Sequence, residues 1–181
     1  MYGMVQLGLE QMVRERHGAD AWNEILDRAG QRGVVFVSNQ PYPDATSYAL
    51  VGATSEVLKE DAGVLLEDFG RYWVADFAPQ HYQTLLDASG DDLATFLGNL
   101  NNLHVRVGLI FPGYEPPSFE VSDVTAGSLR LHYRSHREGL VPFVIGLLRG
   151  IGDRFGQTVE IDSVTPGEGH AVFDVSWRPA A

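Results

Sequence analysis

The chain has 181 residues, and its 24 acidic and 13 basic side chains give a formal net charge of −11. This length predicts one domain, residues 1–181, and a composition that is 44% hydrophobic and 20% charged is typical of a folded globular protein. The chain has no cysteine, which excludes disulfides, zinc–thiolate sites, iron–sulfur clusters and a cysteine nucleophile. The acidity disfavours nucleic-acid and anionic-membrane partners. Because the sequence also lacks a run of about 18 apolar residues and a secretory signal, we expect a cytoplasmic protein.

The first part of the chain, residues 1–112, has the apolar spacing of helices. Gly18 and Gly30 end the first two helical stretches, Asp61 caps the fourth, and Asp91-Asp92 opens the longest, which Pro112-Gly113 closes. The pattern predicts helices over residues 4–16, 21–29, 45–58, 61–77, 81–88 and 92–111.

From residue 113 to 181 the apolar spacing changes to the alternation of strands. Strands are expected over residues 118–124, 128–137, 157–164 and 170–177, with a helix over 139–155. This order predicts an α+β fold: a helical part, then a four-stranded antiparallel sheet in β-β-α-β-β order. We expect Pro116-Pro117 to be a hinge between the two halves of one core.

His104 is the first residue that points to chemistry. It lies within the apolar stripe of its expected helix, between Leu100 and Val107. A core histidine bonded to a backbone carbonyl is the simpler interpretation, and a single histidine is poor support for zinc. One axial imidazole is, however, enough to hold a haem iron.

The expected strand over 128–137 carries the second unusual pattern. Alternation places Leu131, Tyr133, Ser135 and Arg137 on its inner face, so an arginine is directed inward and needs an anionic partner. One of the chain's carboxylates is a sufficient partner, which would leave Tyr133 as ordinary core. Alternatively, two hydroxyls and a guanidinium in a row suit a ligand with two carboxylates, such as the propionates of haem.

Together these residues resemble a known family. A histidine is followed thirteen residues later by a proline and then by Tyr-x-Ser-x-Arg, here His104, Pro117 and residues 133–137. The segments FGRYWV, NLNNLHVRVGLIFP, EPPSFEV and LHYRSHREGLVPFVIGLLRGI extend the similarity over essentially the whole chain. The sequence resembles the H-NOX (haem–nitric oxide/oxygen binding) domain, which occurs alone in bacteria and as the sensor of soluble guanylate cyclase.

The resemblance implies a haem b site between the helical and the sheet-containing parts, with His104 as the proximal iron ligand. It implies that Tyr133, Ser135 and Arg137 bind the propionates. Residues in contact with the macrocycle would be Pro117 on one side and, from the N-terminal segment, Tyr2 and Val5, with Pro117 and Val5 bending the porphyrin.

The resemblance also bears on the gas that is bound. Family members that hold O₂ have a distal tyrosine, supported by a tryptophan and an asparagine. The matching positions here are Phe143, Leu9 and Trp73, and Leu147 belongs to the same expected pocket. Because this wall is poor in hydrogen-bond donors, we expect binding of NO and CO with exclusion of O₂, although Trp73 retains an indole N–H.

The output that the resemblance implies is protein signalling without enzymatic activity. NO would weaken the iron–His104 bond, the helix would shift, and a histidine kinase or a cyclic-di-GMP enzyme would respond. An O₂-binding or redox-sensing haem protein and a haemless carboxylate-binding module remain alternatives. A haem peroxidase is disfavoured because Trp73 and Phe143 supply no distal acid–base pair.

Overall fold

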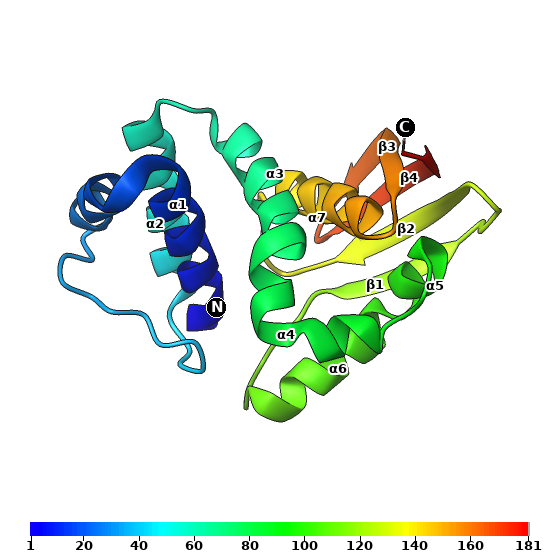
Figure 1. The fold of residues 1–181 in the computed structure, drawn as a ribbon, viewed down its shortest axis with the longest axis horizontal. Helices are drawn as coiled ribbons and strands as arrows, with labels where there is room; N and C mark the ends of the chain where they lie inside the picture. Colours follow the sequence, from blue (N-terminus) through cyan, green and yellow to red (C-terminus); the bar gives the residue numbers. More distant parts are fainter. Residues whose placement is uncertain (181) are drawn as a thin grey trace. The chain divides into compact units, whose positions relative to one another are not determined.

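The computed structural model describes residues 1–180 of the chain, which divides into two compact units, Met1–Phe69 and Gly70–Ala181. Figure 1 shows the elements in chain order. The sheet and the helices of residues 78–110 belong to the same unit. The compact units therefore do not divide at Pro116-Pro117, where the sequence changes from helix to strand. No helix among the described residues has the length and apolar character needed to span a membrane.

The first unit is built on two helices, α1 (Gly3–Arg28) and α2 (Asp44–Leu58). The two helices expected at 4–16 and 21–29 form one element that is kinked at Gly18, whose φ of 85° favours glycine. Tyr2, just before α1, forms a β-bridge with Pro41 and is buried. Helix α1 packs against α2, and the amide of Gln6 donates a buried hydrogen bond of 2.6 Å to Ser47.

The second unit begins within α3 (Ala62–Tyr72), which continues through the π-helix η1 (Trp73–Phe77) into α4 (Ala78–Asp87). The wider turn of a π-helix is frequently found at functional sites, and no sequence pattern predicted it here. The single helix expected over 92–111 is instead α5 (Leu93–Gly98) and α6 (Leu100–Ile110). Gly98 and Asn99 are weak helix formers, and the Asn99 amide donates to the carbonyl of Ser89 at 3.0 Å.

The sheet confirms the predicted order of strands. Its four antiparallel strands are arranged β1-β2-β4-β3, and α7 (Val141–Arg154) connects β2 to β3. The strands are β1 (Ser118–Ser122), β2 (Ser128–Arg134), β3 (Gln157–Gly167) and β4 (His170–Pro179). Strand β2 ends three residues earlier than predicted, because the backbone N–H of Arg137 turns back to the hydroxyl of Ser135 at 3.0 Å.

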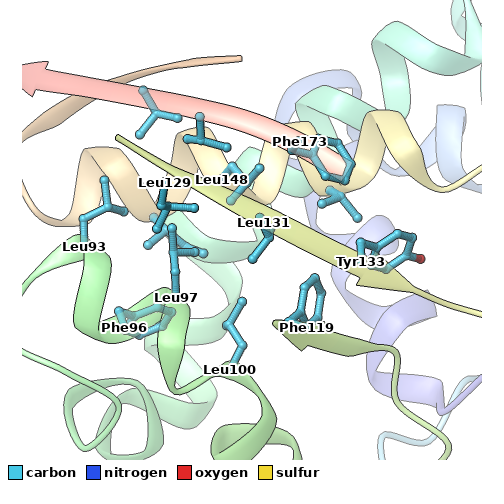
Figure 2. Packing of buried hydrophobic residues seen from close by; sticks show 14 of the residues in the cluster. Leu93, Phe96, Leu97, Leu100, Phe119, Leu129, Leu131, Tyr133, Leu148 and Phe173 are labelled. Atoms are coloured by element: carbon cyan, nitrogen blue, oxygen red, sulfur yellow. The ribbon is translucent and has the colours of Figure 1, made fainter. Parts of the chain in front are cut away.

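The core of the second unit lies on one face of this sheet. Figure 2 shows Leu129 and Leu131 of β2 facing the leucines of α5 and α7, with Phe173 of β4 beside them. Figure 1 shows α7 lying across the same face. The opposite face carries the charged residues of β2, including Arg130, which pairs with Asp174 of β4 at 2.9 Å. The alternation read from the sequence thus separates core from surface.

Helix α7 is fixed by glycines that allow close backbone contact. A Cβ atom on Gly150 would lie 2.9 Å from the carbonyl oxygen of Arg71 and 3.0 Å from the Cβ of Val74. Gly70 similarly faces the backbone of Phe143 and Leu147. The glycines therefore set the distance between α7 and the α3–η1 segment, where several expected site residues lie.

We predict that Gly150→Ala destabilises the protein, because the added methyl group meets backbone that cannot rotate away. Overpacking of this kind costs about 1–3 kcal/mol of unfolding free energy. Gly52→Ala in α2 is the matched control, since its Cβ meets nothing within 4 Å and alanine is favoured in helices by roughly 0.5–1 kcal/mol. Thermal unfolding of both variants measures the difference; a Gly150→Ala variant as stable as Gly52→Ala would contradict the packing argument.

Candidate functional site

His104 lies in α6 with its ring close to two aromatic residues. The ring centroid is 5.6 Å from that of Phe119, at an interplanar angle of 29°, and 6.2 Å from that of Tyr114. Burial lowers the pKa of His104 to about 4, so the imidazole is neutral, which is the form that ligates metals. Its Nδ1 atom is buried and has no hydrogen-bond partner among the described residues. A core histidine held through Nδ1 by a backbone carbonyl is therefore not what the structure shows.

Phe119 connects His104 to the sheet. It lies in β1 directly opposite Tyr133 of β2, and the two ring centroids are 5.4 Å apart. Figure 2 shows both rings at one end of the core, with the Tyr133 hydroxyl pointing away from the leucines. The polar end of Tyr133 thus leaves the core on the side where the strand ends.

Tyr133, Ser135 and Arg137 lie close together, although not on one strand face as alternation predicted, because β2 ends at Arg134. Burial raises the pKa of Tyr133, while a hydrogen bond with Ser135 and the positive charge of Arg137 act in the opposite direction. The backbone N–H of Ser135 donates to the carbonyl of Gly169 at 3.0 Å, which ties the residue to the β3–β4 turn. The three side chains therefore form one group of donors, although only Tyr133 lies within the strand.

The loop before β1 brings this group close to His104. Arg137 Nη1 donates to the backbone carbonyl of Glu115 at 2.9 Å. The neighbouring Tyr114 is close enough to Arg137 for the guanidinium to oppose the effect of burial, which raises the Tyr114 pKa to about 12. The ring of Tyr114 therefore lies near that of His104, and the positive charge of Arg137 acts on the Tyr114 hydroxyl.

Trp73, Phe143 and Leu147 are placed by the contact between η1 and α7. All three are half-buried, and Trp73 and Leu147 pack against the core of the second unit. The ring of Trp73 lies 4.8 Å from that of Phe77, which lies 4.5 Å from the exposed His81. The residues expected on the gas-binding side thus come from two elements, η1 and α7, which lie where Gly70 of α3 and Gly150 of α7 allow close backbone contact.

The remaining expected residues are distributed between the two units. Pro117 is half-buried in the second unit, two residues before Phe119. Tyr2, Val5 and Leu9 belong to the first unit, where Tyr2 and Leu9 are buried and Val5 is half-buried. Their place beside a cofactor stays a prediction.

Sequence analysis missed Phe119 and Tyr114 as residues of this site. Phe119 falls within the strand expected over 118–124, but nothing in that pattern related it to His104. Tyr114 is an aromatic residue between Pro112-Gly113 and Pro116-Pro117, and an aromatic between two turn signals is a usable indication of a loop that folds onto a site.

Comparison with known proteins decides the family. A family model described as Haem-NO-binding matches residues 2–163. The chain belongs to this haem–NO-binding (H-NOX) family. The H-NOX relatives include soluble guanylate cyclase gcy-31 of Caenorhabditis elegans, 27% identical over 158 residues, and soluble guanylate cyclase 89Da of Drosophila melanogaster, 25% identical over 155 residues. The matches cover 87% and 86% of this chain but only 22% and 23% of those cyclases.

Solved structures show the same fold. The H-NOX protein from S. oneidensis in the Fe(II)NO ligation state is 23% identical, with a TM-score of 0.87, and the match covers 98% of this chain and 99% of that one. The unliganded Fe(II) H-NOX protein from K. algicida is 22% identical, with a TM-score of 0.84 and coverages of 98% and 97%. The predicted α+β arrangement is thus confirmed as an H-NOX fold.

Proposed function

We propose that this chain is a haem-based gas sensor that binds NO and CO at ferrous haem b and excludes O₂. The observation that carries the proposal is the group of residues around His104. A neutral, half-buried imidazole with an unpartnered nitrogen lies within one aromatic cluster with Tyr133, whose hydroxyl is joined to Ser135 near Arg137. Membership of the haem–NO-binding family supports the same assignment.

The residues present fit haem, which is a flat apolar group with two carboxylates on one edge. His104 would hold the iron, because a neutral imidazole is a suitable axial ligand. Tyr133, Ser135 and Arg137 would hold the propionates with hydroxyl and guanidinium donors. The residues proposed to contact the ring are Pro117, Tyr2, Val5, Trp73, Phe143 and Leu147. When bound, haem would supply an iron that takes a diatomic gas as a ligand.

The side chains of η1 and α7 support selectivity for NO over O₂. Phe143 has no donor, and a bound O₂ requires a donor far more than NO or CO does. Trp73 carries an indole N–H, so it is the one residue of this proposed wall, within the described chain, that offers a donor from its side chain. Loss of a strong donor costs about 1.5–3 kcal/mol, or one to two decades in affinity.

The proposed output depends on His104, whose release from a bound iron would free α6 to shift. We propose that a partner protein, a histidine kinase or a cyclic-di-GMP enzyme, reads this change in the cytoplasm, and that the chain itself is not an enzyme. The cyclase relatives support a sensory role within larger proteins, since the chain spans about a fifth of their length.

Replacing His104 with glycine tests the ligand. We expect the purified reduced protein to show a haem Soret band that changes with CO and NO. In His104→Gly, axial ligation is lost, and added imidazole restores a coordinated spectrum because it fills the space beside Phe119. A colourless protein that takes up no supplied haem would remove the proposed function, whereas an unchanged spectrum in His104→Gly would assign the iron to another residue.

Arg137→Ala is expected to lose haem faster than Ser135→Ala. The arginine offers a charge-assisted and potentially bidentate bond, whereas the serine offers a single neutral hydroxyl. Haem transfer to an excess of apomyoglobin, followed by absorbance, gives the two rates. Equal rates would contradict the assignment of Arg137 to the propionates.

Phe143→Tyr is expected to shift the protein toward O₂ binding. The wild-type ferrous protein should stay ligand-free in air-saturated buffer. A tyrosine hydroxyl is worth about 1–2 kcal/mol to a polar bound gas, so a gain of roughly tenfold in O₂ affinity is expected. Absorption spectra under air and argon measure the change. A stable O₂ complex of the wild-type protein would overturn the selectivity and identify Trp73 as the donor to examine next.

A further inference from the structure

Asn101 joins the helix of His104 to the edge of the sheet through two hydrogen bonds. Its side-chain amide donates to the backbone carbonyl of Phe119, and its Oδ1 accepts from the backbone N–H of the same residue at 2.8 Å. Asn101 lies in α6, one turn before His104, and Phe119 is the residue whose ring stacks on the His104 imidazole. One residue of β1 is therefore bound by α6 both through its backbone and through its side chain.

The position of β1 explains why these backbone groups are available. Strand β1 is at an edge of the sheet and pairs on one side only, with β2. Both backbone hydrogen-bonding groups of Phe119 are taken by Asn101, which acts where a further strand would bond. Only a side chain that both donates and accepts satisfies the two groups at once, and asparagine does so, whereas an ionised aspartate accepts only.

Helix α6 has few other attachments. Leu100 is its one fully buried residue among those that the structure describes, while Val105, Leu109 and Ile110 are exposed. Ile110, three residues after Val107, has the spacing of the apolar stripe that contains His104, yet it is exposed. Leu103 packs against the core, and the guanidinium of Arg106 donates to the backbone carbonyl of Ala88 at 3.3 Å. With little further burial to fix its rotation, the helix depends on directional contacts, of which the two bonds of Asn101 are nearest to His104.

We propose that Asn101 is a positioning residue that clamps α6 to β1 and so sets how readily His104 leaves the iron. This inference rests on the proposed function. A shift of α6 that carries His104 away must break the two bonds or pull Phe119 and the edge of β1 with it. The clamp therefore favours the arrangement in which His104 is bound.

The test compares Asn101→Ala and Asn101→Asp with Asn102→Ala. Asn102 is the matched control: it is the next residue of α6, it is exposed, and its amide reaches only the side chain of Asn99, at 3.2 Å. Three quantities are measured in the haem-bound protein: amide hydrogen exchange of Phe119, the iron–histidine stretching frequency by resonance Raman, and the rate at which His104 is lost after mixing with NO.

In Asn101→Ala, we expect the Phe119 amide to exchange at least about tenfold faster, the stretching frequency to fall, and His104 loss to accelerate by roughly tenfold. Asn101→Asp keeps the acceptor for the Phe119 N–H but loses the donor to its carbonyl. The Phe119 amide should therefore stay protected while His104 loss accelerates by a smaller factor. Asn102→Ala should match the wild type in all three quantities.

The outcomes separate the two proposals. A faster Phe119 exchange in Asn101→Ala with an unchanged stretching frequency and an unchanged rate would show that the bonds only stabilise the fold, and would overturn the positioning role alone. An unchanged rate of Phe119 amide exchange in Asn101→Ala would also overturn the positioning role. If Asn101→Ala does not fold, Asn101→Asp decides on the same two haem readouts. A wild-type protein without a haem spectrum would instead overturn the proposed function, and the positioning role with it.

Discussion

The stacking of the His104 imidazole on Phe119 is the contact through which the rest of the site is connected. Phe119 stacks on His104 and also pairs with Tyr133 across the β1–β2 ladder. Burial against these rings keeps the imidazole neutral. In the proposed sensor, a displacement of α6 would therefore act on the sheet next to Tyr133, near the end of β2 that Ser135 and Arg137 follow.

The position of the polar group of Tyr133, Ser135 and Arg137 is determined by where strand β2 ends, at Arg134. Leu129, Leu131 and Tyr133 follow the inner face of the strand, and the burial declines as the chain leaves the core. Ser135 is still fixed by the β3–β4 turn, and its hydroxyl accepts from the backbone of Arg137. Two hydroxyls and a guanidinium are thus held at the rim of an apolar layer. Such a rim meets the needs of a ligand with an apolar body and an anionic edge.

Much of this arrangement could be read from the sequence, because it depends on periodicity. Alternation predicted the four strands, which the structure confirms, and a common strand face for Tyr133, Ser135 and Arg137, whereas β2 ends at Arg134 and leaves two of the three residues beyond the strand. Periodicity failed where a local hydrogen bond or a tertiary contact decides the outcome. The Asn99 side chain separates α5 from α6, and the π-helix at Trp73–Phe77 forms within an ordinary helical pattern.

Asn101 is a residue near the candidate site whose contacts the sequence pattern could not predict. On a helix, an asparagine among exposed residues reads as part of a solvated face, and nothing in the sequence relates it to Phe119, 18 residues away. Its two bonds exist only because β1 is an edge strand, which is a property of the sheet order and not of either segment. Residues that act through edge strands are therefore those that a sequence reading is most prone to miss.

The second unit fixes its helices by different physical means. Gly70 and Gly150 bring α7 so close to α3 and η1 that added volume has no room, which restricts movement of the segments that carry Trp73 and Phe143. Helix α6 buries little and is held by directional bonds, which break over short displacements. In the proposed sensor, the elements that choose the gas are therefore rigid, and the element that responds is lightly held. Selectivity and release are then separable, since a change in either set of contacts leaves the other in place.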